Sequence, residues 1–164
     1  MTPGEFLEMW DTLVTPSTNQ ELEAREVVTG SGVWVARDNA EHQHLLVQVD
    51  GRTELGLDET HGLSVAISRH RIAGRADAPY VDLVCLDSGA LQTFATVAAD
   101  IASSVAQEPI EARTAAVAAA IREWRWFWGV DPGAMSRTDA VGLFGELWFL
   151  NRWAGPSASS VQAW

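Results

Sequence analysis

Lysine is absent from the 164-residue sequence, and all 11 basic residues are arginines. Against them stand 22 aspartates and glutamates, which give a formal net charge of −11. Non-specific binding to nucleic acid needs a positively charged face, so this composition argues against strong DNA binding by these residues as a whole. It also excludes, within this sequence, every active site that requires a lysine side chain.

Cysteine is nearly absent too, since Cys85 is the only one. A single cysteine can form neither an internal disulfide bond nor a cysteine-rich zinc site. The first residues lack the basic segment and apolar core of a signal peptide, and no run of about 18 apolar residues suggests a membrane span. We therefore expect a cytoplasmic protein that makes no membrane contact.

Apolar residues make up 47% of the chain, an ordinary fraction for a globular protein. Their spacing and the turn signals between them predict a first half that is mostly strand. The expected elements are an amphipathic helix at 4–14, a loop at 15–24, and strands at 32–38, 44–49, 62–72 and 80–86. Because the connections are too short for parallel crossovers, the strands should form an antiparallel meander sheet.

The second half of the chain returns to a helical spacing. We expect a helix through Phe94 to Val105, a second at about 109–128 and a third at about 138–153, each with a recognisable start or stop signal. Together with the strands they predict an α+β fold, a meander sheet packed by helices. We divide the chain into an N-terminal α+β domain, residues 1–130, and a linker with one further helix, residues 131–164.

Two polar groups in the strand region are candidate ligand sites. His42 and His44 share one face of a strand and could serve a metal, with Asp58, Glu59 and His61 as nearby donors; a solvated histidine pair is the more common outcome. The other group is the basic run Arg69-His70-Arg71 with Arg75. It could contact phosphate, although ordinary solubilising charge is the expected role.

The end of the second helix carries Trp124, Trp126, Phe127 and Trp128, which cannot all face one core. Trp124 and Trp128 share a stripe, whereas Trp126 points elsewhere. We expect these rings to pack against the following helix or a further domain; stacking on a nucleic-acid base is the alternative.

Glu146 lies in an otherwise apolar and aromatic run, and burying an unpaired carboxylate there costs several kcal/mol. It is therefore either solvated, paired with another group or bound to a metal. Gly142 and Gly145 lie in the turn before it, and each costs about 1 kcal/mol relative to alanine in a helix. Such glycines indicate that something approaches the helix closely beside this carboxylate.

The order Leu-Phe-Gly-Glu-Leu-Trp-Phe-Leu at 143–150, followed by Trp-x-Gly-Pro at 153–156, resembles the N-terminal portion of a bacterial family of PD-(D/E)XK nucleases linked to DNA restriction and phage defence. The resemblance implies that 138–153 is the first helix of a PD-(D/E)XK-like core and that Glu146 is a catalytic, metal-binding acid. It also implies Mg²⁺ as cofactor and DNA as substrate of the intact protein.

In that superfamily the remaining catalytic residues, an Asp and a Glu-x-Lys, come later in the chain. We therefore expect a truncated sequence that is inactive alone and whose acidic portion binds little DNA. A nuclease fragment should expose apolar surface and be poorly soluble or form homo-oligomers. The alternatives are a non-catalytic interaction or regulatory module that docks protein partners of a defence complex, and a degenerate relative that has lost the nuclease core.

Overall fold

The computed structural model describes residues 1–18, 22–52, 55, 62–72 and 76–128, without the side chains of 125–128. The chain divides into two compact units, Met1–Gly129 and Val130–Trp164, and every described residue belongs to the first. The helix expected at 138–153, with Glu146, lies outside the described residues. Within them, no helix has the length and hydrophobicity needed to cross a bilayer.

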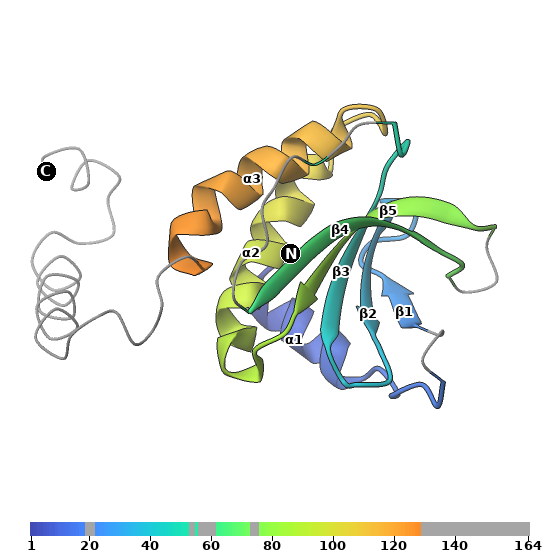
Figure 1. Ribbon diagram of the computed structural model, residues 1–164, viewed down its shortest axis with the longest axis vertical. Helices are drawn as coiled ribbons and strands as arrows, with labels where there is room; N and C mark the ends of the chain where they lie inside the picture. The colour runs from blue at the N-terminus through green and yellow to red at the C-terminus, as the bar shows by residue number, and fades with distance from the viewer. Residues whose placement is uncertain (19–21, 53–54, 56–61, 73–75, 129–164) are drawn as a thin grey trace, which may run out of the picture. The chain divides into compact units, whose positions relative to one another are not determined.

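The first unit is an α+β fold, as the sequence predicted, with an antiparallel sheet and helices (Figure 1). The chain runs in the order α1 (Pro3–Asp11), β1 (Glu23–Glu26), β2 (Val33–Arg37), β3 (Gln43–Gln48), β4 (Leu63–His70), β5 (Ala78–Cys85), a short 3₁₀ turn (Ser88–Ala90), α2 (Leu91–Val105) and α3 (Arg113–Trp128).

The strand order differs from a simple meander at one place. The sheet runs β1-β2-β3-β5-β4, so β5 lies between β3 and β4 and the chain from β3 must reach the far edge before it forms β4. All four pairings are antiparallel, as expected. The edge strand β1 was not predicted, because its sequence Glu-Ala-Arg-Glu has three charged residues among four and reads as a loop.

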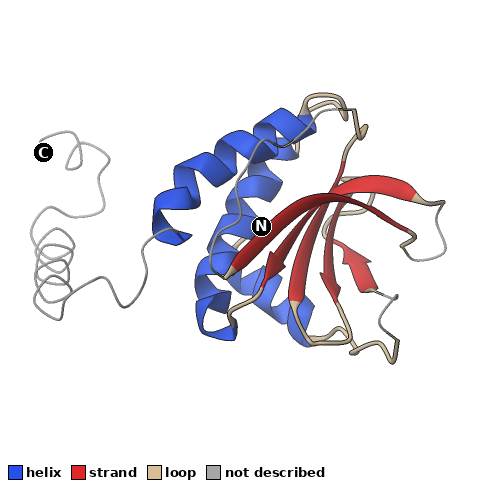
Figure 2. Ribbon diagram, viewed as in Figure 1, coloured by secondary structure: helices blue, strands red, loops and turns tan. Residues whose placement is uncertain are grey.

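The helices cover one face of the sheet and enclose the main core there (Figure 2). Alternate strand residues such as Leu45 and Leu83 point into this core, together with Phe94 and Ile101 of α2, and all four are fully buried. Trp10 of α1 stacks on Phe94 with ring centroids 5.2 Å apart. The two-residue period of the strands and the helical spacing of α2 therefore predicted the core faces correctly.

Side-chain hydrogen bonds stabilise both ends of helix α1. At its start, Thr2 accepts a hydrogen bond from the backbone N–H of Glu5, and the Glu5 carboxylate accepts one from the backbone of Thr2. At its end, the Arg37 guanidinium of β2 donates to the carbonyls of Trp10 and Leu13. A cation at the carbonyl end also complements the helix dipole, which fixes α1 against the sheet.

Candidate functional site

The face of the sheet away from the helices carries a buried group of polar side chains. Because strand residues alternate, His44 of β3 and Asp82 of β5 point away from the core that takes Leu45 and Leu83. His44 Nδ1 lies 2.9 Å from one Asp82 carboxylate oxygen, and His70 Nε2 of β4 lies 3.0 Å from the other. One carboxylate thus joins the three strands β3, β5 and β4.

A small apolar cluster shields this polar group from water. Its buried members are Trp34, Ala36, Leu46, Ile72 and Tyr80, which lie on the same side of the sheet. The side chains of His44 and Asp82 are only 8% and 9% exposed, whereas that of His70 is 22% exposed. The shielding strengthens every electrostatic interaction in the group, since water is largely kept out.

A second carboxylate, Asp38, reaches the same group from the turn between β2 and β3. It accepts hydrogen bonds from the backbone N–H groups of Ala40 and His42, at 2.9 and 2.8 Å, and its other oxygen lies 2.9 Å from His42 Nδ1. The turn is tight enough that Glu41 has a φ of 67°, an uncommon value for a residue with a side chain. That same Asp38 oxygen lies 3.6 Å from His44 Nε2.

The result is an alternating row of imidazoles and carboxylates, His42–Asp38–His44–Asp82–His70, which we call the histidine–aspartate row. An ionised carboxylate only accepts hydrogen bonds, so each imidazole nitrogen that faces one at about 3 Å must carry the proton. His44 is therefore protonated at Nδ1 and His70 at Nε2, and the tautomers follow from the carboxylates they face.

The charges in the row shift one another's pKa values. Burial alone would raise the pKa of Asp82, but the hydrogen bonds from His44 and His70, and their charge, outweigh it and hold the pKa below its usual value. Burial alone would lower the pKa of His44, and Asp82 and then Asp38 outweigh it, so that this pKa is raised. The pKa of Asp38 is lowered too: burial opposes this, and the hydrogen bonds from His42 prevail.

The structure changes the interpretation of the two candidate groups in the strands. His42 and His44 do lie close together, but each faces an aspartate, and no three His, Cys, Asp or Glu side chains of the described residues are grouped so that they could hold a metal ion. Asp58, Glu59 and His61 lie outside the described residues. The metal alternative for the histidine pair is thus not supported by this part of the chain. The expected solvated pair holds for His42, whose side chain is 36% exposed, and not for His44, which is buried.

The basic run is also engaged within the protein. Arg69 donates to the Asp77 carboxylate at 2.7 Å, and His70 binds Asp82. Arg71 is exposed, and Arg75 lies outside the described residues. The side chain of Arg69 is nevertheless 63% exposed, so this ion pair is a weak surface interaction and the run acts as surface charge.

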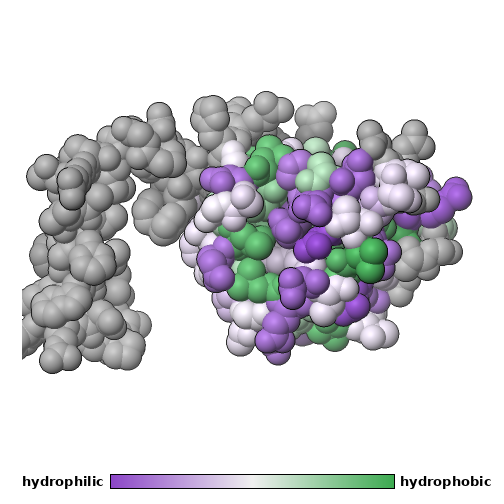
Figure 3. All heavy atoms as spheres, turned by 90° about the horizontal axis from the view of Figure 1, so that it is seen from below, coloured by the Kyte–Doolittle hydropathy of each residue, from purple (hydrophilic) through white to green (hydrophobic). Residues whose placement is uncertain are grey.

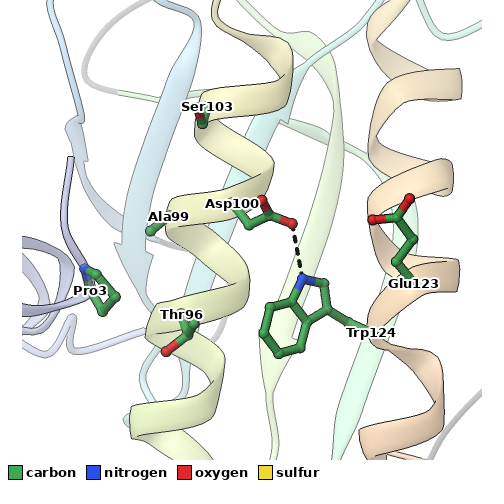
Figure 4. Close-up of a pocket in the computed structure, with 7 residues that line it drawn as sticks. All are labelled: Pro3, Thr96, Ala99, Asp100, Ser103, Glu123 and Trp124. Carbon is green, nitrogen blue, oxygen red and sulfur yellow. Dashed lines mark hydrogen bonds between the residues drawn. The ribbon is translucent and has the colours of Figure 1, made fainter. Parts of the chain in front are cut away.

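Trp124, the tryptophan of this group whose side chain the structure describes, packs against the preceding helix α2, whereas the expected partners, the following helix or a further domain, lie outside the described residues. Trp124 lies over an open groove between α2 and α3, and its indole N–H donates to the Asp100 carboxylate at 2.9 Å (Figure 4). Asp100 and Glu123 both line this groove, so the charged groups beside Trp124 are acidic. Acidic groups there disfavour a nucleic-acid base with its phosphate, which argues against the stacking alternative for Trp124.

The sequence hypotheses missed Asp38 and Asp82, the two residues that organise the row. A signal for Asp82 was present, because it is the one charged residue in the apolar strand Tyr80–Cys85. Asp38 had no such signal, since Asp-Asn reads as an ordinary turn. The contacts of Asp38 are local, within the β2–β3 turn, but the contact of Asp82 is not: His44 and Asp82 are 38 residues apart, and the strand order brings them together.

A family model, DUF4420, whose description reads "Putative PD-(D/E)XK family member", matches residues 6–164. The match therefore covers both compact units and includes the position of Glu146. Comparison with curated proteins and with solved structures gives no match.

Proposed function

The chain belongs to the DUF4420 family, and from this premise we propose that it is part of a metal-dependent DNA nuclease of a bacterial restriction or phage-defence system, acting in the cytoplasm. The observation that supports the proposal is the family match, which spans residues 6–164 and so includes the Leu-Phe-Gly-Glu-Leu-Trp-Phe-Leu run around Glu146. In this proposal Glu146 is the catalytic carboxylate, and residues 1–130 form an accessory domain.

Phosphodiester hydrolysis at neutral pH sets the chemical requirement. A hard cation such as Mg²⁺, held by carboxylates, lowers the pKa of the attacking water and offsets charge on the phosphate. The described residues contain no group of His, Cys, Asp or Glu that could hold such an ion, so they do not fit this role. We therefore assign metal binding to Glu146 and to donors outside the described residues, and none of it to the histidine–aspartate row.

The absence of lysine shapes the expected activity. The usual (D/E)-x-Lys triplet of the superfamily cannot be formed by these 164 residues, so we expect the chain alone not to cut DNA with Mg²⁺. The full open reading frame that encodes these residues should cut. Metal-dependent cleavage by the pure 164-residue chain would contradict the proposed division of roles.

The test is plasmid cleavage by the product of the full reading frame, with Mg²⁺ or Mn²⁺ added, compared among three variants. Glu146→Ala and Glu146→Gln should each lower the rate by at least about 100-fold, because loss of one metal-binding carboxylate removes several kcal/mol of transition-state stabilisation. Glu123→Ala, an exposed glutamate on α3, is the matched control and should leave the rate unchanged. Full activity of Glu146→Ala would refute the catalytic assignment.

A second candidate is a non-catalytic interaction or regulatory module of a defence complex. It is favoured by the lack of lysine and by the lack of a metal-binding group among the described residues. On the face shown in Figure 3, however, the apolar side chains of the described part lie in separate areas among polar ones, and no continuous patch marks a docking surface there. Inactivity of the full reading frame, with one defined protein complex in solution, would favour this candidate.

A further inference from the structure

The ring of His44 lies between two carboxylates, which together favour a positive charge on it. The ring is buried on the outer face of the sheet, with Asp82 at 2.9 Å from Nδ1 and Asp38 at 3.6 Å from Nε2. The Nδ1–H donates to Asp82. The Nε2 atom is buried and makes no hydrogen bond with the described residues.

The protonation of Nε2 decides whether the His44 ring and the Asp38 carboxylate attract or repel each other. In the neutral tautomer fixed by Asp82, Nε2 carries a lone pair that faces the carboxylate of Asp38, and two acceptors without a proton between them repel. A second proton on the ring turns Nε2 into a donor and places one positive charge between two negative ones. In a site shielded from water this difference is large, because the effective dielectric constant is low.

Among the described residues, His44 is the ring that lies between both carboxylates. The titratable groups that face the His44 ring among the described residues are Asp38 and His42 of the β2–β3 turn, Asp82 of β5 and, through Asp82, His70 of β4. Its cross-strand neighbours, Ala36 on β2 and Val84 on β5, are uncharged. Within the row, His42 faces only Asp38 and His70 faces only Asp82, so a second proton on the His44 ring is what connects the two carboxylates.

We propose that the proton on His44 Nε2 is a pH-sensitive link between two carboxylates. With this proton, the His44 ring donates to both Asp38 and Asp82 and so connects the β2–β3 turn to β5 and β4. When the proton is present, the turn and the outer face of the sheet form one connected network. When it is lost, Asp38 and His44 repel, and the turn loosens from the sheet. This device is independent of the nuclease proposal, since it involves none of the residues assigned to metal binding.

The direction of the pH effect follows from the charges. The folded-state pKa of His44 is raised above its ordinary value of 6.5 by Asp82 and Asp38, which outweigh burial. Its stabilising contribution is therefore complete below pH 6.5 and is lost as the pH rises through the raised value. Asp82 has the opposite sign: its pKa lies below 3.8, so its contribution is present above that pH and is lost as the pH falls further.

The first experiment is an NMR titration of the histidine rings in the full chain, with His44→Gln used to assign the His44 signals. We expect His44 to titrate above pH 6.5, with both ring nitrogens protonated at pH 6. In Asp38→Asn the titration should move to lower pH. Asparagine keeps an oxygen acceptor for the backbone N–H groups of Ala40 and His42, so the turn is preserved while the charge is removed. A His44 pKa at or below 6.5 would overturn the proposal.

The second experiment measures the urea midpoint of unfolding between pH 6 and pH 9. The wild-type midpoint should fall as the pH rises, and the fall should be smaller in Asp38→Asn and absent in His44→Gln. Arg69→Gln, which breaks an exposed ion pair near the row, is the control and should keep the wild-type pH dependence. If His44→Gln does not fold, Asp38→Asn alone decides. An unchanged pH dependence in Asp38→Asn would overturn the proposal. A rise of the wild-type urea midpoint with one equivalent of Zn²⁺ at pH 8 would also overturn it, because a metal ion would then take the place of the proton.

Discussion

The indole N–H of Trp10 donates a 3.0 Å hydrogen bond to the main-chain carbonyl of His44, while the ring of His44 binds Asp82 on the opposite face of the sheet. One residue of β3 therefore joins helix α1 on one face to the histidine–aspartate row on the other. Since Trp10 is also stacked on Phe94, the row is coupled to the main core through a single strand position.

Trp10→Phe tests this connection. The substitution removes the hydrogen bond and part of a fully buried ring, so we expect a loss of about 1–3 kcal/mol in the free energy of unfolding. Trp124→Phe is the matched control, because its hydrogen bond to Asp100 is exposed, and it should cost less than about 1 kcal/mol. Urea unfolding monitored by circular dichroism measures both, and equal losses would show that the buried bond contributes little.

Cys85 provides a reporter of the folded state, since it is the only cysteine. Burial raises the pKa of its thiol, and a backbone hydrogen bond from Asp87 only partly opposes this. The thiolate is the reactive form, so we expect the folded protein to react with Ellman's reagent far more slowly at pH 8 than the protein in urea. The contribution of this thiol to stability is present below its ordinary pKa of 9.0 and is lost as the pH rises through the raised value.

A matched control separates burial from reagent access. Cys85→Ala combined with Ser88→Cys places the thiol three residues away at an exposed position. Under native conditions, that folded variant should react with Ellman's reagent as fast as the unfolded protein does in urea. Rapid reaction of the wild-type thiol would mean that the end of β5 opens readily.

How far sequence predicts this fold depends on whether a feature is local. From the sequence alone, the two-residue period of 63–72 predicts that Leu63, Val65 and Ile67 point toward the core. Arg69 and Arg71 continue that parity and must leave the core or find acids. In the structure Arg69 is exposed and pairs with Asp77, so this prediction is confirmed. Such patterns follow from backbone geometry and burial alone.

Features that depend on strand order could not be obtained in the same way. The placement of β5 between β3 and β4 brings His44 and His70 to the same carboxylate, yet neighbouring residues in the chain carry no trace of it. A predicted meander would have placed β4 beside β3 and separated His44 from Asp82. The histidine pair was visible in the sequence and was expected to be solvated, but the sequence alone could not show that His44 is buried against Asp82.

DNA binding by the described surface is a further quantity that the charges predict. The net charge is −11, and Arg69 is engaged with Asp77, so we expect the 164-residue chain to bind a 20-base-pair duplex more weakly than about 10⁻⁶ M at physiological salt. Fluorescence anisotropy measures this. Arg71→Gln should not change the result. Binding that weakens with salt and is lost in Arg71→Gln would show that the basic run contacts phosphate after all.

Gly51 is a position where a side chain would meet a rigid neighbour. It follows β3 with a φ of +71°, and a Cβ atom there would lie 2.9 Å from Cβ and 3.0 Å from Cγ of Pro79, a ring that cannot rotate away. Gly30 has a similar φ of +82° but no atom within 4 Å of the corresponding Cβ position. An alanine at either glycine would have to adopt a left-handed backbone conformation, but only the alanine at position 51 would also clash with Pro79.

Alanine substitutions at the two glycines therefore separate these costs. Gly30→Ala should lose about 1 kcal/mol from the left-handed conformation alone, and Gly51→Ala about 2–4 kcal/mol, because the contact with Pro79 adds to it. In a Pro79→Gly background the cost of Gly51→Ala should fall toward that of Gly30→Ala, since the obstructing atoms are gone. Equal costs for the two single variants would mean that the β3 end shifts freely away from Pro79. That outcome would also predict a weakened hydrogen bond from the Val49 N–H to the Pro79 carbonyl, which hydrogen exchange at Val49 would reveal.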